Sequence, residues 1–332
     1  MKIGFYVPTR GPLSAPENMA ALAKKGESLG FDFLSMTDHL VVPRSRVSDY
    51  PYTKDGNWLP GRFGDFIDQL TAMTFVAGHT TTIRLLTSVL VLPHRKPVPL
   101  AKALASLDYL SGGRLSVGCG AGWMKEEFEA LGTPPHAERG KVADEYIRIF
   151  KELWTSDDPE FHGDYADFSD ITFEPKPVQK PHPPILIGGE SPPAMRRAVR
   201  LGDGWLPMAH NTKVPLDTLE RLQAYIRILH DLAEAEDRDP ATLPVTWFVL
   251  WWGTKPGDPQ SPMEMAPMEM DGPDPGGDRR LLTGSAQQMK DDMAAMEDLG
   301  VESIIVNFEQ ETIAATLEGM EAYADEFVQT GR

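Results

Sequence analysis

A histidine beside a carboxylate, Asp38-His39, follows the second predicted strand and is the first candidate for chemistry. An imidazole titrates at about pH 6.5, so this side chain can give or take a proton near neutral pH. Asp38 would either fix the tautomer of the ring or bind a ligand. The structural alternative is that Asp38 caps the following turn and His39 only fills space.

Glycines follow the fourth and fifth predicted strands, as Gly-Cys-Gly-Ala-Gly at 118–122 and Gly-Gly-Glu-Ser at 188–191, the latter before two prolines. Glycine lets backbone N–H groups approach a phosphate or a flat ring, and a helix N-terminus attracts anions. The second segment therefore predicts an anion site. The alternatives are a tight turn at the first segment and ordinary capping by Ser191 at the second. Trp123 stands where a Rossmann fingerprint needs its third glycine.

Two other kinds of enzyme are disfavoured by the sequence. The eight histidines show no HxH or HExxH spacing, and the serine-nucleophile pattern GxSxG is absent. The one cysteine, Cys119, provides neither a disulfide framework nor a cysteine zinc cluster. We therefore expect no metal-dependent and no serine-based hydrolysis.

The charge and hydropathy of the chain limit the kinds of partner that it is expected to bind. Lys and Arg number 32 against 49 Asp and Glu, a net charge of −17, which disfavours binding to nucleic acid or to an anionic membrane. No apolar run approaches about 18 residues, and the N-terminus lacks a signal-peptide pattern. We expect a cytoplasmic protein with a small-molecule substrate.

The elements that must position these residues alternate strictly along the 332 residues, of which 41% are hydrophobic. Strands are expected at Lys2–Pro8, Phe31–Thr37, Ile83–Leu92, Arg114–Cys119, Pro184–Ile187, Gly204–Pro207, Val245–Trp252 and Ser303–Asn307. Helices are expected at Ser14–Leu29, Phe66–Val76, Pro97–Leu110, Lys141–Trp154, Pro193–Leu201, Leu216–Glu236, Ala286–Leu299 and Thr312–Phe327. Eight such pairs predict a (β/α)8 TIM barrel over residues 1–332, with its chemistry at the carboxyl ends of the strands.

Three connections are too long to be simple turns. Residues 40–64, after strand 2, carry Tyr50, Tyr52, Trp58 and Phe63. The Pro-, Gly- and Met-rich segment 253–280 follows strand 7. Both emerge on the side of the chemistry, as substrate walls or a mobile lid, although the second also has the composition of a disordered loop. Residues 155–183, before strand 5, emerge on the opposite face and are expected to be structural.

The sequence resembles the luciferase-like monooxygenase superfamily. The resemblance lies in TSVLVLPHRKPVPLAKALASLDYLSGGRLSVGCGAGW (87–123), FDFLSMTDH (31–39), FEPKPVQKPHPPILIGGES (173–191) and LGDGWLP (201–207). It implies a (β/α)8 barrel that binds reduced FMN or the deazaflavin coenzyme F420 at the carboxyl ends of the strands. The segments LPHRKP and GCGAGW resemble the F420-dependent branch most, so we expect F420, with FMN as the alternative.

The resemblance also implies roles for individual residues. His39 matches the active-site histidine, with Asp38 beside the cofactor, and Ser88–Val89 matches a dipeptide whose cis peptide bond bulges against the ring system. The further residues implied at the cofactor are Gly120, Gly122, Gly188, Gly189, Glu190 and Ser191, with Trp58, Phe63 and Trp123 around the substrate.

Two departures argue against particular activities of the family. Ala121 stands where bacterial luciferase has a phosphate-binding arginine, and Trp123 stands where F420-dependent glucose-6-phosphate dehydrogenases have a catalytic glutamate. We expect hydride transfer between F420 and an unidentified substrate. The alternatives are a monooxygenase that uses reduced FMN and O2, and a non-catalytic cofactor-binding protein. A homodimer and a reductase that supplies reduced cofactor are expected from the family.

Overall fold

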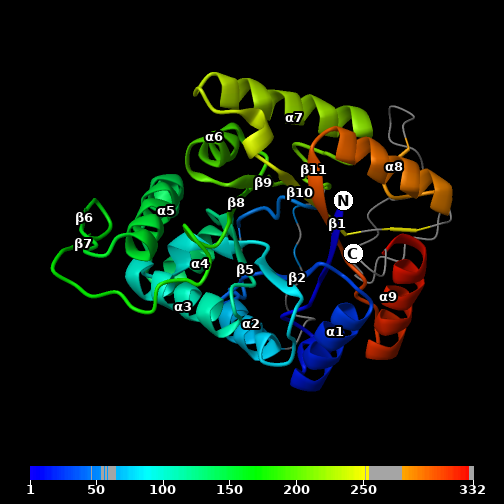
Figure 1. Cartoon of the computed structure of the whole chain (residues 1–332), viewed down its shortest axis with the longest axis horizontal. Helices are drawn as coiled ribbons and strands as arrows, with labels where there is room; N and C mark the ends of the chain where they lie inside the picture. The colour runs from blue at the N-terminus through cyan, green and yellow to red at the C-terminus, as the bar shows by residue number, and fades with distance from the viewer. Residues whose placement is uncertain are drawn as a thin grey trace.

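The computed structural model describes residues 1–45, 47–53, 56, 58, 65–250, 252–253 and 279–328. Within this part of the chain, eight parallel strands close into a barrel that helices surround (Figure 1). The strands are β1 (Lys2–Tyr6), β2 (Phe33–Met36), β3 (Arg84–Thr87) with its continuation β4 (Leu90–Val91), β5 (Leu115–Gly120), β8 (Ile185–Gly188), β9 (Gly204–Leu206), β10 (Val245–Val249) and β11 (Val301–Val306). Because β1 pairs with both β2 and β11, and β3 pairs with β5, the ring is closed, and the predicted fold is confirmed.

The helices follow the strands in the predicted order. They are α1 (Pro16–Ser28), α2 (Gln69–Ala77), α3 (Pro97–Leu110), α4 (Lys125–Leu131), α5 (Arg139–Thr155), α6 (Pro192–Leu201), α7 (Leu219–Glu234), α8 (Ala286–Asp298) and α9 (Ile313–Phe327). Short 3-10 turns cover Pro12–Ser14, Leu92–His94, His136–Glu138 and Pro240–Thr242. Five of the longer helices begin at a side chain that accepts a backbone N–H, which satisfies a donor of the first turn. These caps are Asp68, Ser191, Thr218, Ser285 and Thr312.

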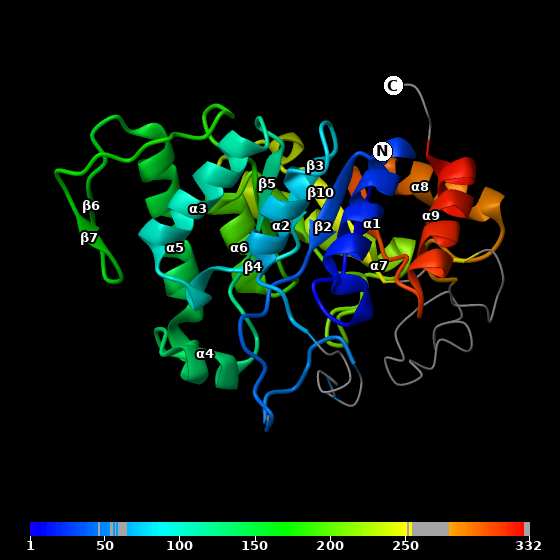
Figure 2. The same cartoon turned by 90° about the horizontal axis from the view of Figure 1, so that it is seen from below.

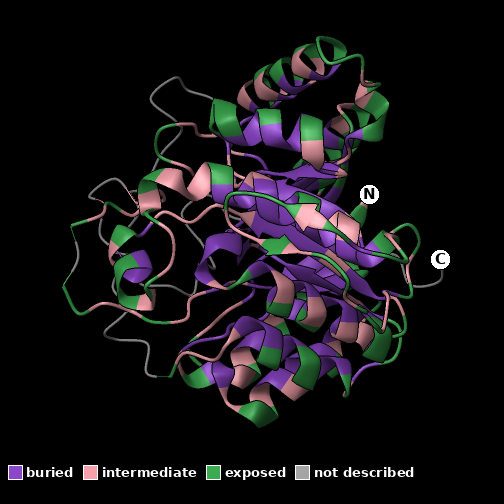
Figure 3. Cartoon of the chain, turned by 90° about the vertical axis from the view of Figure 1, so that its left-hand side faces the viewer, coloured by how far each residue is buried: buried purple, intermediate pink, exposed green. Residues whose placement is uncertain are grey.

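Side chains of alternate strand residues form two apolar layers. In β1, Phe5 packs in the layer between the strands and the helices, whereas its neighbour Tyr6 packs in the barrel interior. In β10, Trp247 and Phe248 divide in the same way. Buried residues accordingly fill the strands and the inner faces of the helices, while exposed residues lie outside (Figure 3). The interior layer closes the barrel below its mouth.

The three long connections differ in position. The segment after β2 and helix α4 lie at the end of the barrel opposite the N-terminus (Figure 2), which is the end where the parallel strands finish. The connection before β8 contains a small antiparallel hairpin, β6 (Phe161–His162) with β7 (Asp167–Phe168), beside α5. Of the predicted mobile loop at 253–280, residues 254–278 lie outside the described residues. No described helix is both long and apolar enough to cross a membrane.

Two features near the site were not predicted. Helix α4 lies in a stretch where we expected no element, and the expected third strand, Ile83–Leu92, is divided into β3 and β4. The division falls at Ser88–Val89, where the backbone leaves the regular strand before Leu90 pairs with Cys119. Both features lie at the mouth of the barrel.

Candidate active site

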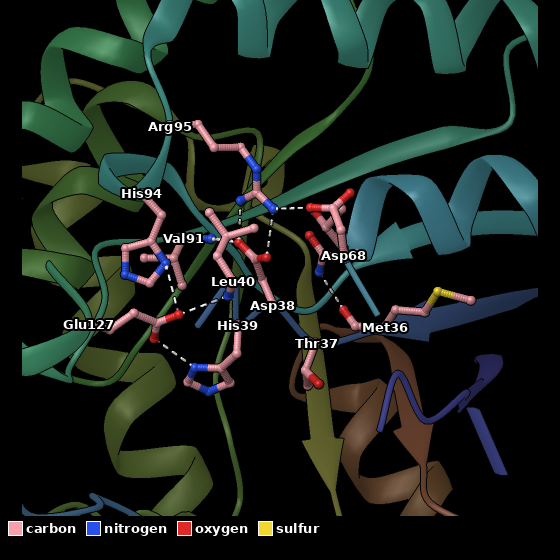
Figure 4. A network of polar contacts seen from close by, with 12 residues as sticks. Met36, Thr37, Asp38, His39, Leu40, Asp68, Val91, His94, Arg95 and Glu127 are labelled. Atoms are coloured by element: carbon pink, nitrogen blue, oxygen red, sulfur yellow. Dashed lines mark hydrogen bonds and ion pairs between the residues drawn. The ribbon is translucent and has the colours of Figure 1, made fainter. Parts of the chain in front are cut away.

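His39 lies at the mouth of the barrel and is held by a buried carboxylate. Its Nδ1 atom is 2.8 Å from Oε2 of Glu127, which belongs to α4 and has no exposed side-chain surface. The other oxygen of Glu127 accepts hydrogen bonds from the backbone N–H groups of Leu40 (2.8 Å) and Val41 (3.2 Å). The His39 side chain is 16% exposed, and its ring is turned toward Glu127 (Figure 4).

The charge of Glu127 is stabilised by its hydrogen bonds. Burial by itself would raise the pKa of this carboxyl group, but the hydrogen bond and charge of His39, the nearby His94 and the Leu40 N–H together lower it below the usual range. Glu127 also lies in the first turn of α4, where the helix dipole favours a negative charge. An ionised carboxylate that accepts the Nδ1–H of His39 fixes the tautomer that leaves Nε2 as the proton acceptor.

The neighbouring Glu126 fastens the segment after β2 to the same helix. Its Oε1 accepts hydrogen bonds from the backbone N–H groups of Val47 (2.6 Å) and Ser48 (3.0 Å), which help lower its pKa to about 2, although burial opposes this shift. The first turn of α4 thus holds this segment through two acidic side chains, one of which also orients His39.

Asp38 is engaged within the protein. Both of its oxygens accept hydrogen bonds from the Arg95 guanidinium, at 2.7 and 2.9 Å, and Oδ2 also accepts the Val91 N–H at 2.9 Å. Arg95 is also bound to Asp68, the cap of α2, at 2.6 Å (Figure 4). Asp38 therefore ties the end of β2 to β4, and any effect on a cofactor would be transmitted through these contacts. The expected position of Asp38 beside the cofactor stays a prediction.

The Ser88–Val89 peptide bond is cis, the conformation that the resemblance implies. The backbone before it is held on one side by Met36, whose carbonyl accepts the Ser88 N–H (2.8 Å), the Ser88 hydroxyl (3.2 Å) and the Gln69 amide (2.7 Å). On the other side, the Thr87 hydroxyl donates to the Gly118 carbonyl at 2.8 Å. Val89 itself remains partly exposed at the mouth.

The glycines beside this bulge make room for it. An added Cβ at Gly120 or Gly188 would lie 2.4 or 2.5 Å from a methyl group of Val89, and one at Gly118 would lie 2.0 Å from the Thr87 carbonyl oxygen. Gly122 has φ +86°, which disfavours any other residue there. These glycines thus have a packing reason independent of a cofactor, and their contact with one stays a prediction.

The predicted anion-binding turn, Gly188–Ser191, precedes α6 and has few helix donors. Pro192 and Pro193 have no N–H group, and the Ala194 N–H is bonded to the Ser191 hydroxyl at 3.4 Å. An anion here would therefore be bound by donors of residues 188–191. Gly189 has φ +103°, a conformation that suits glycine.

Glu190, in the same turn, points into the protein. It is 2% exposed, and it accepts hydrogen bonds from the Met208 N–H (2.7 Å) and the Asn211 amide (2.7 Å). Burial raises the pKa of Glu190, although these bonds oppose the shift. Its side chain positions the loop after β9, and the expected role at the cofactor stays a prediction.

A pocket opens beside His39. Aromatic side chains form much of its wall: Tyr50 and Trp58 line it together with Tyr6, Phe66 and Phe248. The Trp58 ring lies 4.5 Å from the His39 ring, and Trp123 stands perpendicular to Trp58 at 5.8 Å. The segment after β2 reaches across to the loop after β9, where Thr212 donates twice to the Pro51 carbonyl. Trp58 and Trp123 are brought together, and their role around a substrate stays a prediction, whereas Phe63 lies outside the described residues.

A polar group that includes Tyr6 and Arg10 lines the same pocket as His39. The Arg10 guanidinium lies 3.4 Å from the Tyr6 hydroxyl and 3.9 Å from Glu309. Burial raises the pKa of both Tyr6 and Glu309, while the charge of Arg10 opposes both shifts. Sequence reasoning did not identify this group. Among the described residues, no three His, Cys, Asp or Glu side chains form a candidate metal site.

Comparison with known proteins shows the family to which the chain belongs. The family model for the luciferase-like monooxygenase matches residues 1–251. The chain belongs to this family. A protein of Mycobacterium tuberculosis named as uncharacterized is 38% identical over 214 residues, 64% of this chain and 71% of the relative. A monooxygenase structure from Streptomyces bottropensis aligns with 99% of this chain and across 99% of its own length, with a TM-score of 0.72 and 20% identity, which shows the shared fold.

Members with either cofactor resemble this luciferase-like chain. The F420-dependent glucose-6-phosphate dehydrogenase of Amycolatopsis mediterranei is 30% identical over 194 residues, 58% of this chain and 53% of that enzyme. The FMNH2-dependent dimethylsulfone monooxygenase of Pseudomonas putida is 46% identical over 109 residues, 32% of this chain and 30% of that enzyme. The comparisons therefore establish a luciferase-like oxidoreductase or monooxygenase and leave both cofactors open.

Proposed function

We propose that this chain is an oxidoreductase that transfers a hydride between coenzyme F420 and a small organic substrate. The observation that carries the proposal is the His39–Glu127 pair at the rim of an aromatic pocket. Oxidation of an alcohol, for example, releases a hydride and a proton, and the proton needs a base within reach. A histidine whose tautomer is fixed by a buried carboxylate is suited to that role.

The mouth of the barrel fits a flat heterocycle with a phosphate-bearing tail. The partly exposed Val89 forms a raised surface between Gly120 and Gly188, and the turn at 188–191 lies at the end of the adjacent strand β8. When bound, F420 supplies a carbon atom that accepts or donates the hydride. Glycine backbone at this turn allows close approach of an anion.

The chain's own residues would perform the remaining tasks. His39 would take the proton from the substrate at Nε2, while Glu127 stabilises the imidazolium that forms. Trp58 and Tyr50 would cover the apolar side of the substrate and exclude water. Arg10 and Tyr6, which line the same pocket, would donate hydrogen bonds to an oxygen of the substrate.

A reduced-FMN monooxygenase that uses O2 is the second candidate. It is supported by the 46% identity over 109 residues to the dimethylsulfone enzyme. Such an enzyme would need a separate reductase to supply reduced flavin. The expected homodimer, like that reductase, stays a prediction.

Binding measurements separate these proposals. The purified protein is titrated with F420, FMN and FAD, and quenching of cofactor fluorescence is followed; we expect F420 to bind most tightly. Tight binding of FMN alone, with O2 uptake in the presence of a flavin reductase, would favour the second candidate. Lack of affinity for all three refutes both.

The base is tested with His39→Gln, with His162→Gln in the exposed hairpin as the matched control. With F420 bound and a panel of small alcohols, we expect His39→Gln to lower kcat about 10²–10⁴-fold, the usual contribution of general acid–base catalysis. His162→Gln should retain the rate. Equal rates in the two variants would remove His39 from the mechanism.

A further inference from the structure

His94 is a buried imidazole for which the proposed reaction has no use. It follows β4 in a 3-10 turn, and its side chain is only 2% exposed. Within the described part of the chain, neither of its ring nitrogens has a hydrogen-bond partner. Leaving such a group without a hydrogen bond in the interior costs about 1–3 kcal/mol, so a buried imidazole of this kind is expected to have a function.

The nearest charge to this imidazole is the carboxylate that holds His39. Nδ1 of His94 is 3.8 Å from Oε1 of Glu127, while the other oxygen of Glu127 bonds to His39 (Figure 4). A movement of about 1 Å would bring the 3.8 Å separation into hydrogen-bonding range. One buried carboxylate therefore lies between two imidazoles, one open to the pocket and one enclosed.

The other groups around His94 do not provide an alternative partner. Asp38 and Arg95 also act on it electrostatically, but they neutralise each other through two hydrogen bonds. The Phe128 ring packs against His94 with a centroid distance of 5.0 Å, and His136 contacts that same ring. Burial lowers the pKa of His94, and the negative charge of Glu127 opposes that shift.

We propose that His94 is a second proton-holding residue of the site, which shares the Glu127 carboxylate with His39. With Glu127 ionised, the three groups carry a charge of −1 when both imidazoles are neutral, 0 with one added proton and +1 with two. The first proton is stabilised by the carboxylate, and the second is opposed by the first. His94 is thus a positioning residue that tunes proton uptake by His39, and this role does not depend on which cofactor is bound.

The experiment follows the histidine ring carbons of the full-length, cofactor-free protein by NMR. The histidines are labelled at Cε1, and spectra are recorded between pH 5.5 and 8.5. His39→Gln and His94→Gln assign the two signals. In the unsubstituted protein we expect the His94 signal to respond over the pH range in which His39 titrates.

The variants then test the coupling. We expect His94→Gln to move the midpoint of the His39 titration upward, because His39 no longer shares the Glu127 carboxylate with a second imidazole. In a Glu127→Gln background the same substitution should produce no shift. The matched control is His136→Gln, on the far side of Phe128, which should leave the His39 curve unchanged.

Two results would overturn the proposal. One is an unchanged His39 titration in folded His94→Gln. The other is a His94 signal in the unsubstituted protein that stays constant across the titration of His39, which decides the question even where the variant does not fold. Because no cofactor is present, failure here is independent of failure of the proposed hydride transfer.

Discussion

The substitution Glu127→Gln tests the central contact of the site. The substitution keeps the shape of the side chain but removes its charge. In the unsubstituted protein, the His39 ring and the backbone N–H groups of Leu40 and Val41 lie within 3.2 Å of the Glu127 oxygens. A hydrogen bond to a charged group contributes about 1.5–3 kcal/mol and a neutral one about 0.5–1.5 kcal/mol. The glutamine oxygen can still accept from Leu40 and Val41, in weaker bonds, but its NH2 group cannot accept the Nδ1–H of His39. The loss is about 3 kcal/mol in total, and relief of the buried charge offsets part of it.

We therefore expect Glu127→Gln to lower the free energy of unfolding by about 1–2 kcal/mol at pH 7. The pKa of Glu127 is below its ordinary value of 4.5 in the folded protein, so the stability that its charge contributes is fully present above that value and is lost as pH falls through the lowered pKa. The difference from the unsubstituted protein should shrink as pH falls below about 4.5. Urea unfolding followed by tryptophan fluorescence measures it.

Glu126→Gln is the matched control, since Glu126 lies in the same helix turn and bonds the same segment but does not touch His39. With a substrate in hand, we expect Glu127→Gln to reduce kcat about 10–100-fold, the size typical of partners that orient a reacting group, and Glu126→Gln to keep it within about threefold. If the two variants had the same kcat and the same stability, Glu127 would have no particular role toward His39.

Three further predictions concern the surroundings of the site. Gly120→Ala should lower the unfolding free energy by about 1–3 kcal/mol, because its Cβ would meet Val89 at 2.4 Å, whereas Gly78→Ala, whose nearest atom would be at 3.5 Å, should change it little in the same thermal unfolding assay. Arg95→Lys should cost about 1–3 kcal/mol in urea unfolding, since lysine cannot make both bonds to the buried Asp38; the exposed Arg200→Lys is the comparison, and equal losses would contradict the reasoning. Burial lowers the pKa of His210 to about 3, so as pH falls below about 6.5 this histidine takes up a proton in the unfolded chain before it does so in the folded protein. The free energy of unfolding should therefore decline with a slope of up to about 1.4 kcal/mol per pH unit. His210→Gln should show a shallower decline between pH 7 and pH 5.5, and an unchanged slope would exclude His210 as the cause.

The repeated elements were accessible to sequence reasoning because they depend on local chemistry. Apolar runs such as Val245–Trp252 predict buried strands, and the strict alternation with helices predicts a closed barrel. In the same way, the position of His39 at the end of β2 determines that its side chain lies at the mouth. These inferences need only periodicity and the order of the elements along the chain.

The chemistry of the site depends on contacts that no local pattern contains. Glu127 is 88 residues from His39 in the chain, and it lies in a seven-residue helix too short for periodicity to reveal. Its only local indication was a pair of acidic residues after Trp123, which are typical of a first helix turn.

The roles of the other site residues depend on their burial and on their contact partners in the folded chain. Arg95 holds the carboxylate of Asp38 across 57 residues, a contact that no local pattern in the sequence indicates. The glycines at 118, 120 and 188 resembled a ligand-binding pattern, and the structure adds a steric reason, the space taken by Thr87 and Val89. Sequence determines which residues stand at the ends of the strands; closure of the barrel decides which of them touch, because the strand ends converge only in three dimensions.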